Sequence, residues 1–283
     1  MPFDIASNGK IAWGKVPVNL SVPLSAPPGE YKLKFVATPT SGTATTTEWT
    51  IRVAQPSATA YPDLVKQDGA TAYWRFGETS GTTFADSSPY NTVATARDQV
   101  QLGQPGAIAG DGNGSVRLNG GYVDTPHALA VTPSGPCTFE AWIKITSAYQ
   151  QGILEKYTKP ASNGFALRLV DRNVVQLELI GPNGVVSRIT GRTTVQPGQW
   201  HHVAVAYDRS WMDIYVDGKL EFRTPAGGMP TVGDAPLRIG ARGDDAAFRL
   251  NGWIDEVAMY GVPLTAAQIQ AHYDRGALGA PLS

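Results

Sequence analysis

Two adjacent histidines, His201 and His202, are the residues of this sequence most suggestive of chemistry. They lie in the stretch PGQWHHVAVAYDRSWMDIYVDGKL, residues 197–220, which also holds tryptophans and aspartates. Neutral imidazole is a common metal ligand. In a strand, however, neighbouring side chains point to opposite faces, so this pair cannot hold one ion without a bulge. The other two histidines lie far away in the sequence and no HExxH spacing is present. We interpret the pair as structural, and Trp200 beside it as a core residue.

Catalytic carboxylates are the next candidates. Glycoside hydrolysis needs two carboxylates that face each other across a sugar, about 5–10 Å apart. Glu140, Glu155 and Glu178 occur singly, and their spacing does not bring them together. No GxSxG nucleophile motif is present, and the segment GDGNGS lacks the GK[ST] of a phosphate loop and precedes a strand-like run. The sequence therefore predicts a surface turn at GDGNGS and assigns no catalytic residue.

Composition excludes several classes of protein. The chain has 283 residues, a formal net charge of −1 and no cluster of lysine and arginine, which argues against a nucleic-acid partner. No apolar run approaches the ~20 residues of a membrane span. A single cysteine, Cys137, excludes an internal disulfide framework. Met1 begins no basic-then-apolar signal peptide, so we expect either a cytoplasmic protein or a piece of a longer exported protein.

The first part of the chain has the alternating pattern of half-buried strands. Apolar residues alternate over 16–22 and 31–37, and a further strand-like run, EWTIRV, covers 48–53. These runs predict a small Ig-like β unit over residues 1–54. The following residues, 55–61, are mostly small and polar and lie in the proline-bounded stretch AQPSATAYP, which indicates a linker.

Residues 62–283 contain about a dozen short strand-like runs separated by turn residues, which predicts a β-sandwich or barrel. Asn183-Gly184 and Asp217-Gly218 are expected hairpin turns because both pairs tolerate a positive φ. One helix is predicted in TAAQIQAHYDRG. Thr265 is its expected N-cap, Gln268 completes a capping box, and Gly276 is the expected stop.

A set of motifs in this second part resembles the laminin-G-like, concanavalin A-like jelly-roll family. The motifs are YWRFGETSGTTFADSS, FEAWIK, QPGQWHHVAVAYD, MDIYVDG, LRIGAR and GWIDEVAMYGVPLTAAQI, in this order. The resemblance implies two antiparallel sheets, one concave and one convex, in an all-β protein. The family includes lectins, carbohydrate-binding modules, adhesion domains and some glycoside hydrolases, so fold alone does not fix function. Laminarinase-like members carry an ExDxxE motif on one strand, which this chain lacks.

A polar strand face suggests where a sugar could bind. In FEAWIKI, Phe139, Ala141 and Ile143 share one face, whereas Glu140, Trp142 and Lys144 share the other. Sugars take hydrogen bonds from charged and amide groups and stack on aromatic rings. We expect a groove on the concave sheet, with Trp211, on a turn, as a further contact. The predicted ligand-binding residues are Glu140, Trp142, Arg168, Gln176, Glu178 and Trp211. A solvated sheet face is the alternative interpretation.

The resemblance also implies a structural calcium ion. Members of the family often hold calcium with an aspartate at the position of Asp255 in WIDEV, and Glu78 and Asp86 are possible additional ligands by position. Calcium prefers such oxygen ligands. Ordinary solvated or capping carboxylates are the alternative.

The sequence thus favours a non-catalytic carbohydrate-binding region of a larger exported bacterial carbohydrate-active enzyme. Its expected partners are a polysaccharide or glycan and a catalytic domain of the same polypeptide, and its expected location is secreted or cell-surface. Two other classes stay open: a glycoside hydrolase or lyase domain, and a protein–protein adhesion or structural module.

Overall fold

The computed structural model describes residues 29–37, 42–53, 60–147, 149–158, 163–181, 184–228, 233–243 and 245–278. The chain separates into two compact units, Met1–Ser57 and Ala58–Ser283. Each unit is described by itself.

The described part of the N-terminal unit is a pair of antiparallel strands, β1 (Gly29–Ala37) and β2 (Thr45–Val53), in which Leu33 pairs with Trp49. The strand expected over 16–22 lies outside the described residues. An Ig-like arrangement of this unit stays a prediction.

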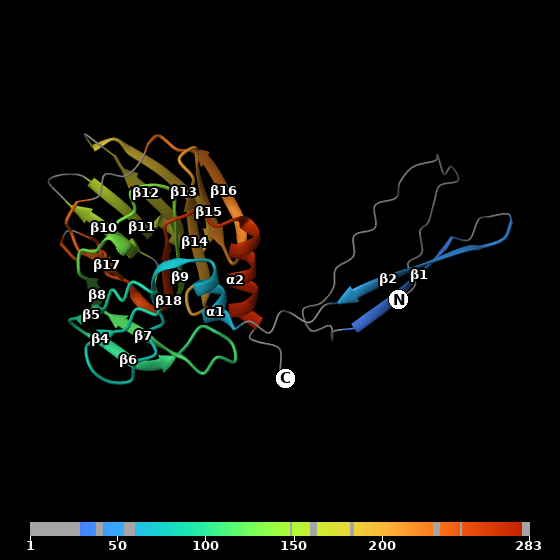
Figure 1. The fold of residues 1–283 in the computed structure, drawn as a ribbon, viewed down its shortest axis with the longest axis horizontal. Coiled ribbons are helices and arrows are strands. Elements are labelled where there is room, and N and C mark those ends of the chain that lie inside the picture. Colours follow the sequence, from blue (N-terminus) through green and yellow to red (C-terminus); the bar gives the residue numbers. More distant parts are fainter. Residues whose placement is uncertain are drawn as a thin grey trace. The chain divides into compact units, whose positions relative to one another are not determined.

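The second unit is an antiparallel sandwich of two sheets (Figure 1). Sheet I has the strand order β16-β15-β14-β9-β18-β7-β6, with β3 also paired to β18. Its strands are β3 (Ala70–Trp74), β6 (Val100–Pro105), β7 (Gly114–Asn119), β9 (Cys137–Ile145), β14 (His201–Tyr207), β15 (Trp211–Val216), β16 (Lys219–Pro225) and β18 (Asn251–Tyr260). The segment GDGNGS forms the turn that enters β7, as predicted.

Sheet II has the order β13-β12-β11-β10-β17-β8-β5-β4. Its strands are β4 (Thr83–Phe84), β5 (Ala94–Arg97), β8 (Tyr122–Thr125), β10 (Gln151–Thr158), β11 (Asn163–Val170), β12 (Val174–Ile180), β13 (Val186–Thr194) and β17 (Leu237–Ile239). Short 3-10 turns cover Leu129–Val131 (η1) and Asp171–Asn173 (η2).

Strand alternation builds the core between the sheets. Phe139, Ala141 and Ile143 of β9 point into it, as their spacing predicts, and meet residues of sheet II. The rings of Phe139 and Phe165 stack with centroids 4.3 Å apart. Burying such aromatic and branched side chains supplies the main driving force for folding. Every second residue of β9 is consequently directed to the outer face of sheet I.

Two helices lie against the outer face of sheet I (Figure 1). The C-terminal helix α2 spans Ala266–Leu278, and its capping box is confirmed: Thr265 Oγ1 accepts from Gln268 N at 3.3 Å, and Gln268 Oε1 accepts from Thr265 N at 2.9 Å. The expected stop at Gly276 is wrong. This glycine lies inside α2, where an added Cβ would fall 2.4 Å from the Trp142 ring, so its role is close packing.

The short helix α1 (Tyr61–Gln67) was not expected from the sequence. Tyr61, the last residue of the predicted linker, is its first residue and is buried, with its hydroxyl oxygen accepting from Trp142 Nε1 at 3.1 Å. No described helix is long and apolar enough to cross a membrane.

The histidine-containing stretch forms strands β14 and β15 and the start of β16. His201 bonds to Asp217, whereas His202 points to the other face and bonds to Glu140, so the structural interpretation is confirmed. Asp217 and Gly218 have φ values of 50° and 75°, as expected for the predicted hairpin turn. Gly218 also needs its small size, because a Cβ there would lie 2.8 Å from Gln270 and 2.9 Å from Tyr273 of α2.

Replacing Thr265 by alanine should lower the unfolding free energy by about 1 kcal/mol, because the first turn of α2 loses its side-chain acceptor. Urea denaturation measures this change. Thr265→Ser keeps the hydroxyl and should stay within about 0.5 kcal/mol of the wild type. Equal losses in the two variants would contradict the capping role.

Candidate ligand-binding site

The five residues predicted to line one groove lie on opposite sides of the sandwich. Glu140 and Trp142 belong to β9 and lie on the outer face of sheet I, whereas Arg168, Gln176 and Glu178 belong to β11 and β12 of sheet II. The prediction of one groove is therefore wrong. The faces of the individual strands were predicted correctly, but the assignment of strands to sheets was not.

Glu140 is fully buried beneath the helices, in a network of polar groups. Its carboxylate contacts His202 of β14 at 3.2 Å, His272 of α2 at 3.0 Å and the hydroxyl of Tyr260 of β18. The histidines, above all His272, hold the pKa of Glu140 well below its usual range, against the opposing effect of burial. This carboxylate joins α2 to sheet I and is closed to a glycan.

His272 carries a positive charge in this network. Its Nδ1 lies 3.0 Å from Glu140 and its Nε2 lies 3.0 Å from Asp68, at the end of α1. Carboxylates only accept hydrogen bonds when ionised, so both ring nitrogens must donate. Burial acts to lower the pKa of His272, but Glu140 and Asp68 raise it overall.

Trp142 is also closed to ligand. It is 2% exposed and lies under α2, where its ring stacks on Tyr273 with centroids 5.9 Å apart. Both residues that the sequence placed in the groove from β9 are thus part of the contact between sheet I and the helices.

Two of the three predicted residues of sheet II, Arg168 and Glu178, belong to a network of charged side chains, and the third, Gln176, bonds separately. Arg168 pairs with Glu155 at 3.1 Å and with Glu178 at 3.7 Å. Glu178 also pairs with Arg188 at 2.6 Å, and Gln176 donates to Thr190 at 2.9 Å. Burial raises the pKa of Glu155 to about 7, although Arg168 opposes that rise. Glu155 is fully buried, and both it and Glu178 pair with the guanidinium of Arg168. A sugar therefore cannot lie between these two carboxylates.

Trp211, at the start of β15, is 41% exposed and has the guanidinium of Arg223 5.9 Å from its ring centre. It lies apart from the other predicted ligand-binding residues, on the face where Arg223 pairs with Asp213 at 2.6 Å. A single exposed tryptophan is common on protein surfaces.

The carboxylates predicted to bind calcium are not brought together. Among the described residues, no three His, Cys, Asp or Glu side chains form a group that could hold a metal ion. Asp86 accepts four hydrogen bonds, from Tyr73 N, Ser88 N, Ser88 Oγ and Thr92 N. One oxygen of Glu78 accepts from Ala85 N, and Asp255 accepts from Ala107 N and Glu256 N. The three residues do not fit one ligand set, and calcium binding stays a prediction of the resemblance.

The outer face of sheet I carries a second group of side chains, which we call the tryptophan row: Arg117, Trp253, Lys144 and Trp200. Lys144 Nζ lies 4.3 Å from the ring centre of Trp253 and 5.0 Å from that of Trp200. On the other side of Trp253, the guanidinium carbon of Arg117 lies 4.9 Å from the centre of the Trp253 ring. Cations and rings therefore alternate across the sheet.

Strand register produces this row. Trp253 of β18 is paired with Arg117 of β7 on one side and with Lys144 of β9 on the other. Lys144 follows Glu140 and Trp142 at every second position, so it lies on the same outer face. All four side chains of the row are half-buried, unlike Glu140 and Trp142. Each cation–ring contact contributes about 0.5–2 kcal/mol, which holds the rings in fixed positions.

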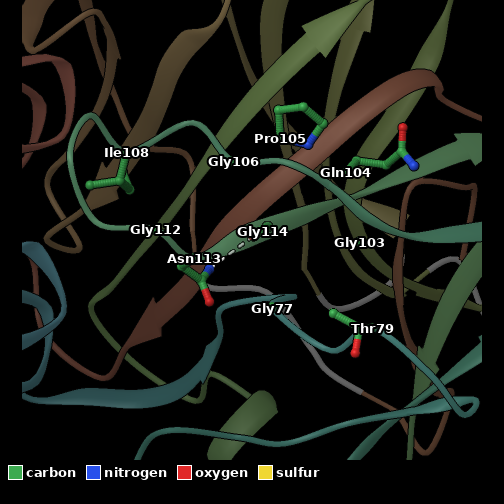
Figure 2. Close-up of a pocket in the computed structure, with 10 residues that line it drawn as sticks. All are labelled: Gly77, Thr79, Gly103, Gln104, Pro105, Gly106, Ile108, Gly112, Asn113 and Gly114. Carbon is green, nitrogen blue, oxygen red and sulfur yellow. Dashed lines mark hydrogen bonds between the residues drawn. The ribbon is translucent and has the colours of Figure 1, made fainter.

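A cavity of about 510 Å³ adjoins the row (Figure 2). Its lining residues are Gly77, Thr79, Gly103, Gln104, Pro105, Gly106, Ile108, Gly112, Asn113 and Gly114. Gln104 belongs to both features, because its Oε1 accepts from Trp253 Nε1 at 3.4 Å. Glycine at 106 is required by close backbone approach, since a Cβ there would lie 2.2 Å from the carbonyl oxygen of Asn113.

Two buried acids lie behind the cavity wall. Glu256 has a φ of 50° at a bulge in β18, and both Asp255 and Glu256 are buried there. Asp255 accepts from the backbone of Ala107, and Glu256 pairs with Arg75 at 3.2 Å. Burial raises the pKa of both carboxyls. These acids fix the loop that forms the cavity and do not line it.

The sequence interpretation missed the tryptophan row. It placed Trp200 in the core, and Trp200 does pack, half-buried, against the cluster beneath the helices. It did not consider Trp253, Lys144 or Arg117 as contacts. Period-two alternation in GWIDEV and FEAWIK gave the face of each side chain, but only the pairing of β7, β18 and β9 shows that they are neighbours.

The fold is that of a lectin-like jelly-roll domain. The chain belongs to the concanavalin A-like lectin/glucanases superfamily, whose family model matches residues 117–270.

Solved binding domains share the fold. The binding domain of botulinum neurotoxin serotype G is 14% identical with a TM-score of 0.59, covering 72% of this chain and 50% of that one. The binding domain of Paraclostridial Mosquitocidal Protein 1 is 12% identical with a TM-score of 0.59, covering 73% and 52%. The ligand-binding domain of botulinum neurotoxin serotype D, solved with N-acetylneuraminic acid, is 16% identical with a TM-score of 0.58, covering 74% and 51%. The chain thus spans about half the length of these structures, and at these identities the likeness concerns the fold.

The charge of His272 predicts a pH-dependent stability. A histidine whose pKa is raised by folding stabilises fully below its unfolded pKa of about 6.5, and this contribution is lost as pH rises through the folded pKa. His272→Gln should therefore lower the unfolding free energy by about 3–5 kcal/mol near pH 6, and by less at alkaline pH. Urea denaturation across this range measures the difference.

The matched control is His127→Gln, which removes a histidine whose side chain is 42% exposed and contacts Lys156 at 3.3 Å, so it should cost less stability than His272→Gln near pH 6. If the loss in His272→Gln stayed constant or grew with rising pH, the charge assigned to His272 would be wrong.

Gly106→Ala should destabilise the protein by about 1–3 kcal/mol, because the new methyl group would collide with the backbone of Asn113. Thermal unfolding measures the change. Gly261→Ala is the control, since its nearest contact would be an ordinary 3.7 Å to Thr71. Equal melting temperatures for the two variants would contradict this prediction, because they would show that the backbone at Asn113 can move to accommodate the methyl group.

Proposed function

We propose that this chain is a non-catalytic carbohydrate-binding region that binds a glycan along the tryptophan row and in the adjoining cavity. The observation that carries the proposal is the pair of half-buried tryptophans, Trp200 and Trp253, which lie on either side of Lys144 on the outer face of sheet I. The apolar face of a sugar ring stacks on such rings, while its hydroxyls bond to neighbouring polar groups.

The cavity supplies the polar groups. Gln104, Asn113 and Thr79 line it with amides and a hydroxyl, and glycines leave backbone groups accessible between them. A mixture of a few polar groups and apolar surface is typical of sites that orient small ligands. Membership in a superfamily of lectins and glucanases supports a glycan as the ligand. A domain of the same fold, the ligand-binding domain of botulinum neurotoxin serotype D, was solved with N-acetylneuraminic acid, which also supports a glycan as the ligand.

The proposal extends to the setting of the chain. A separate N-terminal β unit next to a lectin-like sandwich supports an accessory region of a larger exported carbohydrate-active enzyme, secreted or held at the cell surface. The glycosidase alternative has less support, because Glu155 and Glu178 share Arg168 and Glu155 is closed to solvent.

A glycan array followed by calorimetry on the bound glycan tests the proposal. Trp253→Ala should weaken binding by about 2 kcal/mol, roughly thirtyfold, because it removes a stacking surface. Trp211→Ala removes an exposed tryptophan outside the row and should bind as the wild type does. The melting temperatures of both variants show whether they fold.

Three outcomes would contradict the proposal. The absence of any bound glycan, together with a tight protein partner, would indicate an adhesion module. Release of reducing sugar from polysaccharides would indicate an enzyme. A loss of binding in Trp211→Ala with none in Trp253→Ala would move the site to the other end of sheet I.

A further inference from the structure

The cations of the tryptophan row differ from the other half-buried cations of the sandwich. Arg75 pairs with Glu256 and Arg238 with Asp124, at 3.2 and 3.0 Å. Arg117 and Lys144 have no carboxylate within 4.0 Å among the described residues, and their described partners are tryptophan rings. The row is therefore a site of uncompensated positive charge on the sandwich.

Neither cation has its hydrogen-bonding capacity satisfied by the described part of the chain. The Nε atom of Arg117 is buried and has no hydrogen-bond partner there. Lys144 lies between two rings, which offer no lone pair, and partial burial lowers its pKa. Guanidinium and ammonium groups carry five and three N–H donors respectively, so acceptors must come from water or from a ligand.

A ligand that covers the rings also takes water away from these two cations. Desolvating a charge is costly unless a hydrogen-bonded counter-charge replaces the water. The hydroxyl oxygens of a neutral sugar stacked on Trp253 would offset only part of that cost, whereas an acid group would supply a counter-charge as well as acceptors. Arginine in particular matches the geometry of a carboxylate or sulfate.

The adjoining cavity indicates where the acid group does not lie. The buried carboxyls of Asp255 and Glu256 are directly behind the cavity wall, and Gly106 separates one of them from the cavity. The described residues that line the cavity include no lysine or arginine, so an acid group finds its cations over the row and not in the cavity. Gln104, which contacts Trp253, joins the two parts and offers an amide to the sugar hydroxyls.

We infer that the ligand is an acidic glycan, whose carboxylate or sulfate pairs with Arg117 and Lys144 while its sugar rings stack on Trp253 and Trp200. This inference rests on the proposed function and adds the chemical class of the glycan.

Matched pairs of polysaccharides test the inference by affinity electrophoresis and calorimetry. The carboxylate pair is polygalacturonate and its methyl ester, and the sulfate pair is dextran sulfate and dextran. We expect the wild type to bind the acidic member of at least one pair at least about tenfold more tightly than the neutral member, because one charged hydrogen bond contributes about 1.5–3 kcal/mol. The pair that responds distinguishes carboxylate from sulfate. Binding should weaken as salt is raised.

Lys144→Met keeps the aliphatic stem between the two rings and removes the charge, so it should weaken binding of the acidic polysaccharide about tenfold. Arg117→Gln is a second variant with the same expectation, should either variant fold poorly. Lys219→Met removes an exposed lysine outside the row and should bind as the wild type does, which controls for net charge.

Equal binding of acidic and neutral members, or neutral glycans alone on the array, would overturn the inference and leave the proposed function standing. Failure of every glycan would remove both. Binding of single-stranded oligothymidylate as tight as that of the acidic polysaccharide would also overturn it, because the row would then recognise polyanions without regard to sugar. Acidic binding unchanged in both variants would place the anion elsewhere.

Discussion

The buried carboxylate of Glu140 is the interaction on which the outer face of sheet I depends. It is held between His202 and His272, and it therefore fixes α2 against the sheet. Removing one partner would leave a charge buried without compensation, which costs several kcal/mol. The same carboxylate lies on β9 four residues before Lys144, so the strand that carries this cation of the tryptophan row is also the strand to which α2 is fixed.

Alternation along single strands could be predicted from the sequence. It separated His201 from His202 and gave Phe139 a core position, since both follow from the two-residue repeat of a strand. The capping box of Thr265 and Gln268 was equally local. The arrangement of these strands in a two-sheet sandwich was predicted from the motifs shared with the jelly-roll family.

The site depended on contacts between residues far apart in the chain. Glu140 and His272 are 132 positions apart. Glu140 is buried and hydrogen-bonded only because α2 packs over the outer face of sheet I. In the same way, β9 and β12 have equivalent alternating patterns but belong to different sheets. The short α1 escaped prediction because its burial comes from Trp142 and α2 and not from a helical repeat of its own.

The Asp217-Gly218 turn has a consequence for variation of this scaffold. Gly218 is limited by its φ and by the side chains of α2 that lie against it, so the tip of this hairpin is packed against α2. Length changes there would push α2 from the sheet. A family of such domains is therefore expected to keep the length of the β15–β16 hairpin and its glycine, while exposed side chains of the hairpin, such as Lys219 and Leu220, are free to vary.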